Sequence, residues 1–354
     1  MEKKHLKNIG ITELQTEMVA MGEQKFRAQQ LKKWIYQKRV DTFDQMINLS
    51  KQFREHLDQV YTIKKMEIIQ ILESKNGDAV KFGFRCVESS HLVESVVLID
   101  GDRRTACLSS QLGCGLACVF CQTGKMGFIR NLTQEEIIGQ LIGINDYLSL
   151  RSDKLITNIV FMGMGEALSN YSNFRSSLDI IMDEELFNIG GRRITVSTAG
   201  VIPSIEKLMS EKLNIGLAIS LNAFTNEQRD QLMPINKKYP IESLVAAARR
   251  YYNATGRRVT FEYVIIDGQT NTNDALDAIK KYLGDFPCKI NLIPVNPSKD
   301  KQLKSPSDTN LDKFAEELQR RGITATVRKS RGQDIWGACG QLAGRDLNSE
   351  NIPH

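Results

Sequence analysis

Histidine and tryptophan are scarce in this sequence, which has four histidines and two tryptophans among its 354 residues. The histidines, His5, His56, His91 and His354, are scattered along the chain, which argues against a histidine-rich zinc or copper site. Low-complexity tracts and blocks of like charge are also missing, so extensive disorder is not expected. We therefore expect the chemistry of this protein to depend mainly on sulfur.

Long apolar runs are absent as well. The run LNIGLAISL at 213–221 is far shorter than the roughly 20 residues that span a membrane. The N-terminal segment MEKKHLKNIGITELQTEM lacks the apolar stretch of a secretory signal peptide. We expect a cytoplasmic protein that does not enter the membrane, and its seven cysteines are then reduced thiols rather than a disulfide framework.

The overall charge sets only a weak limit on partners. The chain has 47 Lys and Arg residues against 42 Asp and Glu residues, a net charge of +5. This excess permits an anionic partner without requiring one. Hydrophobic residues make up 41% of the chain, and its length suggests two to three domains, or one large α/β barrel with an appendage.

Local patterns divide the chain into four parts. Helical spacing with many lysines and arginines predicts an N-terminal helical domain at 1–62, in which Phe26, Leu31, Trp34 and Ile35 lie near one face. Alternating apolar residues predict a β segment at 63–100, with a hairpin turn at NGD, 76–78. The catalytic barrel is expected at 101–345 and a short tail at 346–354.

The barrel prediction comes from six apolar runs that alternate with amphipathic helices. Such alternation is typical of right-handed βα units on a parallel sheet, so we predict an α/β fold with a partial (βα)6 barrel. Residues at the carboxyl ends of such strands form the active sites of these folds. The runs are TACLSS (105–110), ITNIVFM (156–162), RRITVST (192–198), IGLAISL (215–221), VTFEYVII (259–266) and KINLIPV (289–295).

Four cysteines follow the first barrel strand, at positions 107, 114, 118 and 121. The last three have the spacing of a helix stripe, but Gly113, Gly115, Gly124 and Gly127 make a helix unfavourable, so a loop fits better. All four thiolates could hold a structural zinc, although zinc ribbons pair two C-x2-C motifs and only one occurs here. An iron–sulfur cube on three cysteines would instead leave one iron open.

The motif C-x3-C-x2-C formed by Cys114, Cys118 and Cys121 resembles the signature of the radical S-adenosylmethionine (SAM) superfamily. The wider sequence resembles the RlmN/Cfr family of RNA adenine methyltransferases over nearly the whole chain. The motifs that carry this resemblance are GEQKFRAQQLKKWIY (22–36), CLSSQLGCGLACVFCQTGKMGFIRNL (107–132), GMGEAL (163–168), VSTAG (196–200), LMPIN (232–236), NLIPVNP (291–297) and RKSRGQDIWGACGQLAG (328–344).

The resemblance implies a [4Fe-4S] cluster on the three cysteines and two SAM molecules per turnover. It also implies that Cys339 accepts a methyl group, that Cys107 breaks the resulting protein–RNA thioether, and that Glu94 accepts a proton. From the residues alone, Glu94 reads as a solvated strand-edge glutamate and Cys339, among glycines, as a flexible, accessible thiol. Cys86 and Cys288 are expected to be buried bystanders.

Cofactor contacts are expected where the strands end. The residues in question are Gly163, Gly165, Glu166, Ser197, Ser220, Leu221, Asn222 and Asn296. Three residues depart from the family pattern, in which Asn222 is usually histidine and Phe224 and Ala167 are usually proline. Asparagine retains a donor and an acceptor but cannot carry charge, which puts a proton-transfer role at 222 in doubt.

RNA contacts are expected from basic pairs beside these motifs, because phosphate contacts dominate nucleic-acid affinity. The candidates are Arg103, Arg104, Arg130, Arg192, Arg193, Lys237, Lys238, Arg257, Arg258, Arg328, Lys329 and Arg331, with Lys32, Lys33 and Arg39 in the helical domain.

Within the family, one branch methylates carbon 2 of adenosine in 23S rRNA and tRNA, and the other methylates carbon 8 of adenosine in rRNA. GFIRNL (127–132) and the long helical domain favour the carbon 2 branch, whereas GMGEAL and LMPINKKYPIE lean toward carbon 8. Other classes remain open: a non-catalytic, zinc-stabilised RNA-binding protein, or a radical SAM enzyme for another substrate. For the favoured interpretation, a carbon 2 methyltransferase, we expect a monomer that takes electrons from a donor such as flavodoxin or ferredoxin.

Overall fold

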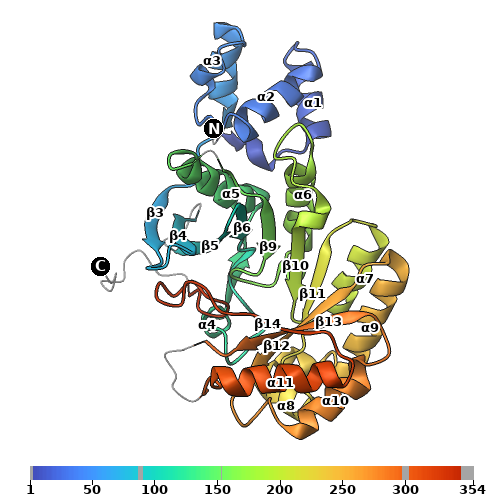
Figure 1. Cartoon of the computed structure of the whole chain (residues 1–354). Helices are drawn as coiled ribbons and strands as arrows, with labels where there is room; N and C mark the ends of the chain where they lie inside the picture. Colours follow the sequence, from blue (N-terminus) through green and yellow to red (C-terminus); the bar gives the residue numbers. More distant parts are fainter. Residues whose placement is uncertain (1–2, 87–90, 153, 297–302, 344–354) are drawn as a thin grey trace.

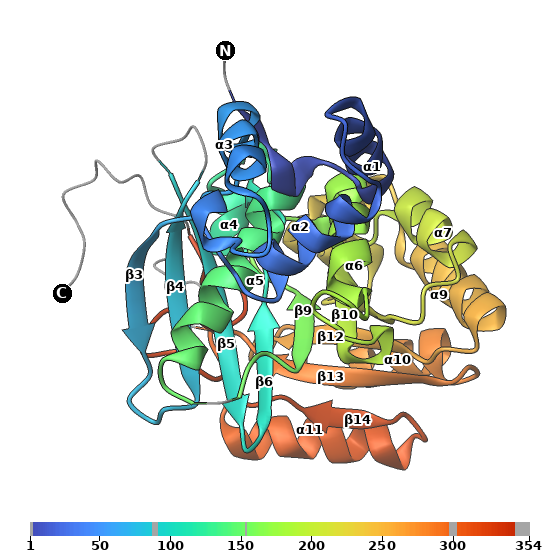
Figure 2. The same cartoon turned by 90° about the horizontal axis from the view of Figure 1, so that it is seen from above.

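The computed structural model describes residues 3–86, 91–152, 154–296 and 303–343, and the expected tail at 346–354 lies outside them. Its main feature is a curved sheet with the order β14-β13-β12-β11-β10-β9-β6-β5-β4-β3. The sheet does not close on itself, because β14 and β3 are both edge strands (Figure 1, Figure 2). Its strands are β3 (Ile68–Glu73), β4 (Ala79–Arg85), β5 (Leu92–Asp100), β6 (Arg103–Cys107), β9 (Asn158–Phe161), β10 (Ile194–Thr198), β11 (Gly216–Ser220), β12 (Val259–Ile265), β13 (Cys288–Pro294) and β14 (Ala325–Val327).

Strands β6 and β9 to β14 run parallel and form the partial barrel. The six predicted strands and the α/β class are confirmed. Periodicity does not predict β14, because its three residues are too few to show an alternating pattern. The helices that connect these strands are α5 (Gln134–Ser149), α6 (Tyr171–Met182), α7 (Ile202–Ser210), α8 (Asn226–Leu232), α9 (Ile241–Thr255), α10 (Asn273–Leu283) and α11 (Asp308–Arg320).

Antiparallel strands β3, β4 and β5 extend the same sheet beyond β6. The predicted turn at 76–78 joins β3 to β4, and Gly77 adopts a positive φ there. Val96 on β5 lies opposite Cys107 on β6, so the extension is bonded directly to the first barrel strand. Helix α5 covers this part of the sheet, where Tyr147 packs edge-on against Phe82 with ring centroids 5.0 Å apart.

The N-terminal helices α1 (Ile11–Ala20), α2 (Phe26–Tyr36) and α3 (Lys51–Val60) lie at one end of the molecule beside α5 and α6 (Figure 1). Strands β1 (Lys4–His5) and β2 (Tyr61–Thr62) pair and bring the two ends of this module together. The module is tied to the barrel by an ion pair of 2.6 Å between Arg39 and Asp146 on α5. A second ion pair, of 2.7 Å, joins Lys33 to Glu185 after α6.

The prediction that Lys32 contacts RNA is wrong. Its side chain is only 3% exposed, and its Nζ donates a hydrogen bond to the carbonyl oxygen of Ile9 at 2.6 Å. Lys32 shares the buried face of α2 with Ala28 and Ile35, which lie about one turn before and one turn after it, and this burial lowers its pKa to about 8. Phe26, predicted on the apolar face, is instead exposed.

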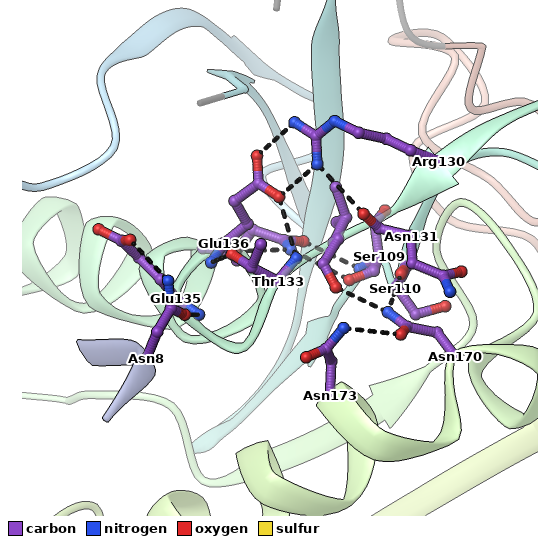
Figure 3. Close-up of polar contacts among 12 residues, drawn as sticks. Asn8, Ser109, Ser110, Arg130, Asn131, Thr133, Glu135, Glu136, Asn170 and Asn173 are labelled. Atoms are coloured by element: carbon purple, nitrogen blue, oxygen red, sulfur yellow. Dashed lines mark hydrogen bonds and ion pairs between the residues drawn. The ribbon is translucent and has the colours of Figure 1, made fainter. Parts of the chain in front are cut away.

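The start of α5 is defined by a reciprocal cap. The Thr133 hydroxyl accepts from the Glu136 N–H at 3.2 Å, and the Glu136 carboxylate accepts from the Thr133 N–H at 3.0 Å (Figure 3). Arg130 donates two hydrogen bonds of 2.7 Å to the same carboxylate. This network joins α5 to the small antiparallel pair of β7 (Gln111–Gly113) and β8 (Phe128–Asn131), which carries the cysteine motif together with the short helix α4 (Gln122–Lys125).

Candidate active site

The three closely spaced cysteines lie in a loop between β7 and α4, as the glycine content predicts. Gly113 ends β7 with a φ of +73°, and a Cβ at this position would lie 1.9 Å from the carbonyl oxygen of Gly127. The Cys114 N–H donates to that same oxygen at 2.8 Å. Only glycine fits this crossing of β7 and β8, so the backbone places Cys114 at the start of the loop.

Cys114, Cys118 and Cys121 line one cavity of about 180 Å³. Burial raises the pKa of Cys114 to about 11 and also raises the pKa of Cys118, so both are thiols at neutral pH until a metal replaces the proton. Among the described residues, no three His, Cys, Asp or Glu side chains form a group that could hold a single metal ion.

This arrangement fits a [4Fe-4S] cluster better than zinc. The three thiolates of a cube bind three different irons, so they need not converge on one point, whereas four zinc ligands must. Cys107, the fourth sulfur that the zinc alternative requires, lines a different cavity. The donor set therefore fits a cluster with one iron left open to a small ligand.

Glu166 lies at the centre of the expected cofactor contacts, after β9. One of its oxygens accepts from the Ala199 N–H at 2.8 Å and the other from the Leu168 N–H at 3.2 Å, while burial raises its pKa to about 7. Gly165 has a φ of +92°, and a Cβ there would lie 2.4 Å from the Cβ of Gln111. The expected contacts that line the same cavity are Gly163, Gly165, Glu166, Ser197, Ser220, Asn222 and Asn296.

Asn222 and Leu221 differ in where their side chains lie. Asn222 lines the cavity with a φ of +58°, a region that asparagine tolerates better than most residues. Its Oδ1 accepts from the Val264 N–H at 2.9 Å, and its Nδ2 lies 3.3 Å from the sulfur of Met233. Leu221 is buried in the hydrophobic core and does not line the cavity.

The C-terminal segment brings Cys339 to the cysteine loop. The thiol of Cys339 is exposed, as predicted, but the backbone around it is hydrogen-bonded rather than free. The Cys339 carbonyl accepts from Asn296 Nδ2 at 2.9 Å, and the Gly340 carbonyl accepts from the Gln122 N–H at 2.7 Å. Glycine content predicts backbone freedom, and these tertiary contacts remove it.

A second cavity, of about 710 Å³, is lined by both Cys107 and Cys339. It follows the inner face of the barrel toward the starts of the strands, where Arg103, Arg193 and Lys289 lie. Burial raises the pKa of Cys107 to about 12, and the nearby Cys339 adds to this effect. Because Cys339 also lines the cavity of the cysteine loop, it lies between the two spaces.

Glu94 is not the solvated strand-edge residue that its sequence pattern indicates. It is 4% exposed, because both faces of β5 are covered here and the segment that contains Ala343 packs on Glu94. Lys81 on β4 donates to one of its oxygens at 3.1 Å, and the Ala343 N–H donates to the other at 2.8 Å. Glu94 lines neither cavity, but it contacts the segment that carries Cys339.

The basic candidates separate into two groups. Some line the larger cavity, and others do not. Arg130 is one of the others, since its guanidinium forms an ion pair with the buried Glu136. Those that line the larger cavity are Arg103, Arg192, Arg193, Arg328, Lys329 and Arg331, and those that do not are Arg104, Arg130, Lys237, Lys238, Arg257 and Arg258.

Cys86 and Cys288 are both buried, as predicted for bystanders. Sequence reasoning did not single out two buried cations, Lys81 and Arg229. A lysine inside the apolar run AVKFGF is a signal that could have identified Lys81. The sequence around Arg229 carries no comparable signal.

Comparisons with known proteins agree with this geometry. Residues 4–63 match the family described as the ribosomal RNA large subunit methyltransferase N-terminal domain, and residues 108–282 match the radical SAM superfamily. A protein from Marinobacter nauticus described as a dual-specificity RNA methyltransferase RlmN is 42% identical over 348 residues, which cover 97% of this chain and 94% of that protein. The chain belongs to the RlmN family.

RlmN-family membership also agrees with a solved structure. A radical SAM methyltransferase from Sphaerobacter thermophilus superposes with a TM-score of 0.91 at 39% identity, covering 96% of this chain and 99% of that one. The chain is thus a radical SAM RNA methyltransferase, and the RlmN match does not favour the carbon 8 alternative. In the described part of the chain, no helix is long and apolar enough to cross a membrane.

Proposed function

We propose that this protein methylates carbon 2 of an adenosine in the peptidyl-transferase centre of 23S rRNA, and of an adenosine in the anticodon loop of tRNA. The position of Cys339 carries the proposal. It lines both the cavity of the three cysteines and the larger cavity with its basic residues, so one thiol faces the methyl source and the RNA.

When bound, a [4Fe-4S] cluster and SAM supply a carbon-centred radical, which avoids the poor nucleophilicity of carbon 2. We assign the cluster to Cys114, Cys118 and Cys121. SAM is assigned to the cavity lined by Gly163, Gly165, Glu166, Ser197, Ser220, Asn222 and Asn296, with Leu221 supporting the end of β11 from the core. Two SAM molecules are consumed in each turnover.

The two catalytic thiols have separate tasks. Cys339 takes a methyl group on sulfur, and this methyl group would lose one hydrogen atom to the carbon-centred radical before its carbon bonds to carbon 2 of the adenine. The adduct would return one electron to the cluster and lose the ring proton, which leaves a thioether between Cys339 and the RNA. The Cys107 thiolate then attacks the sulfur of Cys339, which breaks the bond to the RNA and leaves a disulfide between the two cysteines. The electron pair of the broken bond stays on the new carbon, which takes up a proton, and a thiol reductant restores the pair.

Glu94 accepts the proton that the adenine ring loses. The ion pair with Lys81 supports this role, because it fixes the position of the carboxylate, and a base must lie within hydrogen-bond reach of the proton that it removes. The hydrogen bond from Ala343 also joins Glu94 to the segment of Cys339.

The larger cavity is the proposed binding site for the adenosine and its phosphates. Its volume suits a nucleotide, and the basic residues at its rim suit an anionic backbone. We further propose a cytoplasmic monomer that receives electrons from a carrier such as flavodoxin or ferredoxin.

Incubation of the reconstituted protein with SAM, a reductant and either a 23S rRNA fragment or tRNA tests this function. Chromatography of the digested RNA should give 2-methyladenosine from both RNAs. Cys339→Ala should abolish the product, and Cys288→Ala, at a buried bystander, should leave it. Formation of 8-methyladenosine would overturn the assignment to carbon 2, and no methyladenosine from a protein with full cluster content would overturn the function.

A further inference from the structure

Arg229 on α8 is completely buried, with an exposure of 0%. All five N–H bonds of its guanidinium have acceptors in the described part of the chain, and each acceptor is a neutral oxygen. The Nη2 group donates to the Ala199 carbonyl at 2.7 Å and to the Ser220 carbonyl at 3.0 Å, and Nε donates to the Leu221 carbonyl at 3.0 Å. The Nη1 group donates to Asn236 Oδ1 at 3.1 Å and the Tyr239 carbonyl at 3.5 Å.

These contacts join the carboxyl ends of β10 and β11, from which the proposed cofactor residues Ser197 and Ser220 project. The peptide of Ala199 links two buried groups, because its carbonyl accepts from Arg229 while its N–H donates to Glu166. Arg229 therefore holds the backbone on which the cofactor cavity is built.

A buried cation without a carboxylate partner is costly, because hydrogen bonds to neutral oxygens replace hydration only in part. Burial lowers the pKa of Arg229 to about 10, and the Asp230 carboxylate opposes this effect only in part. Within the described residues, Arg229 forms no ion pair with a carboxylate; the Asp230 carboxylate instead accepts from Asn236 at 2.7 Å. A negatively charged group bound nearby would supply the countercharge that these residues do not.

The cysteine loop is the closest candidate for that charge. The Val119 N–H donates to the carbonyl of Leu232, the last residue of α8, at 3.1 Å, so the loop and the helix of Arg229 are in direct contact. Leu232 and Met233, which follow Arg229, belong to the buried cluster against which Cys118 of the loop packs. A cluster held by three thiolates carries net negative charge, and one added electron makes it more negative.

We propose that Arg229 is a positioning residue whose charge stabilises the reduced form of the cluster, an inference that rests on the proposed cluster at Cys114, Cys118 and Cys121. The step is the transfer of one electron from an external one-electron donor, with no bond formed or broken. A fixed positive charge beside the cluster favours the state that has gained the electron. The same guanidinium keeps the ends of β10 and β11 in place.

The experiment is a redox titration of the reconstituted protein without RNA, followed by electron paramagnetic resonance, on Arg229→Met, Arg229→Lys and the wild type. Arg250→Met, at a half-exposed ion pair on α9, is the control. For Arg229→Met we expect the ratio of reduced to oxidised cluster at a fixed potential to fall about tenfold, a midpoint lower by about 60 mV. Arg229→Lys should stay near the wild-type midpoint, because it keeps the charge, while its thermal stability falls.

A midpoint potential equal to that of the wild type, in an Arg229→Met variant with a full content of cluster, would overturn the proposal. So would a fall of the midpoint in Arg229→Lys as large as that expected for Arg229→Met, since geometry rather than charge would then be responsible. If Arg229→Met does not fold, Arg229→Gln, which also removes the charge, takes its place in the titration. The titration contains no RNA, so its result does not depend on methylation. Failure of the wild type to methylate RNA in the separate assay would count against the proposed function and not against this role of Arg229.

Discussion

Lys81 and Glu94 form an ion pair of 3.1 Å in which both side chains are almost completely buried. Lys81 comes from β4 and Glu94 from the neighbouring β5, and Gly83 rather than Lys81 lies directly opposite Glu94 in the sheet. The pair also contacts the Cys339 segment, since Lys81 Nζ donates to the Trp336 carbonyl at 3.4 Å and Glu94 accepts from Ala343. One buried pair thus joins the β extension to the segment of the proposed methyl-carrying cysteine.

Removal of one partner from this pair should be strongly destabilising. Lys81→Met is expected to lower the free energy of unfolding by about 3–5 kcal/mol, because it leaves a buried carboxylate without its partner. The double variant Lys81→Met, Glu94→Gln should be more stable than Lys81→Met alone. Urea denaturation measures both values. Arg85→Met, at the exposed pair with Glu67, is the control and should change stability by less than about 1 kcal/mol.

Gly113 and Gly127 give a matched test of the cysteine loop, because both have a φ near +70°. Gly113→Ala would place a Cβ 1.9 Å from the Gly127 oxygen, whereas nothing lies within 4 Å of a Cβ at 127. We expect Gly113→Ala to cost more than about 3 kcal/mol and to reduce bound iron and sulfide. Gly127→Ala should cost only about 1–2 kcal/mol for the backbone strain. Equal iron content in the two variants would contradict this account of the loop.

Variants of Cys107 and Cys339 should stop the reaction at different steps if the two cysteines have the tasks assigned to them. Cys107→Ala can still take up the methyl group on Cys339 but cannot break the thioether, so a covalent protein–RNA adduct should accumulate on a denaturing gel. Cys339→Ala should form no adduct. Cys86→Ala, at a buried thiol, should turn over without accumulating it. An adduct in Cys339→Ala would show that another residue forms the bond to RNA.

Buried Lys32 should make stability depend on pH in an alkaline window. Its pKa is about 8 in the folded chain, against an ordinary value of 10.5, so the unfolded chain binds more protons between these limits. Stability therefore rises with pH from about 8 to 10.5, by an amount on the order of 3 kcal/mol for this residue. Urea denaturation across this range should show the rise in the wild type and in Lys33→Met, at an exposed neighbour, and a smaller rise in Lys32→Met.

The sequence by itself determines the secondary structure and the chemical class. The alternation of apolar runs and amphipathic helices predicts the six parallel strands, because the periods of strand and helix are local properties of the backbone. The spacing of Cys114, Cys118 and Cys121 and the glycines around them predict a loop with three sulfur ligands, which is also a local pattern. The ordered motifs from 22 to 344 indicate the family.

Tertiary structure alone decides which charged groups are buried and what they contact. Lys32 lies inward because its face of α2 packs against the rest of the N-terminal module. Glu94 is buried because the segment of Ala343 covers its side of the sheet. Arg229 and Lys81 contact groups that are distant in sequence or on other strands. The free energy of a charge depends on everything that surrounds it in space, so a pattern within one segment, such as the lysine in AVKFGF, can mark a buried charge but does not reveal its partners.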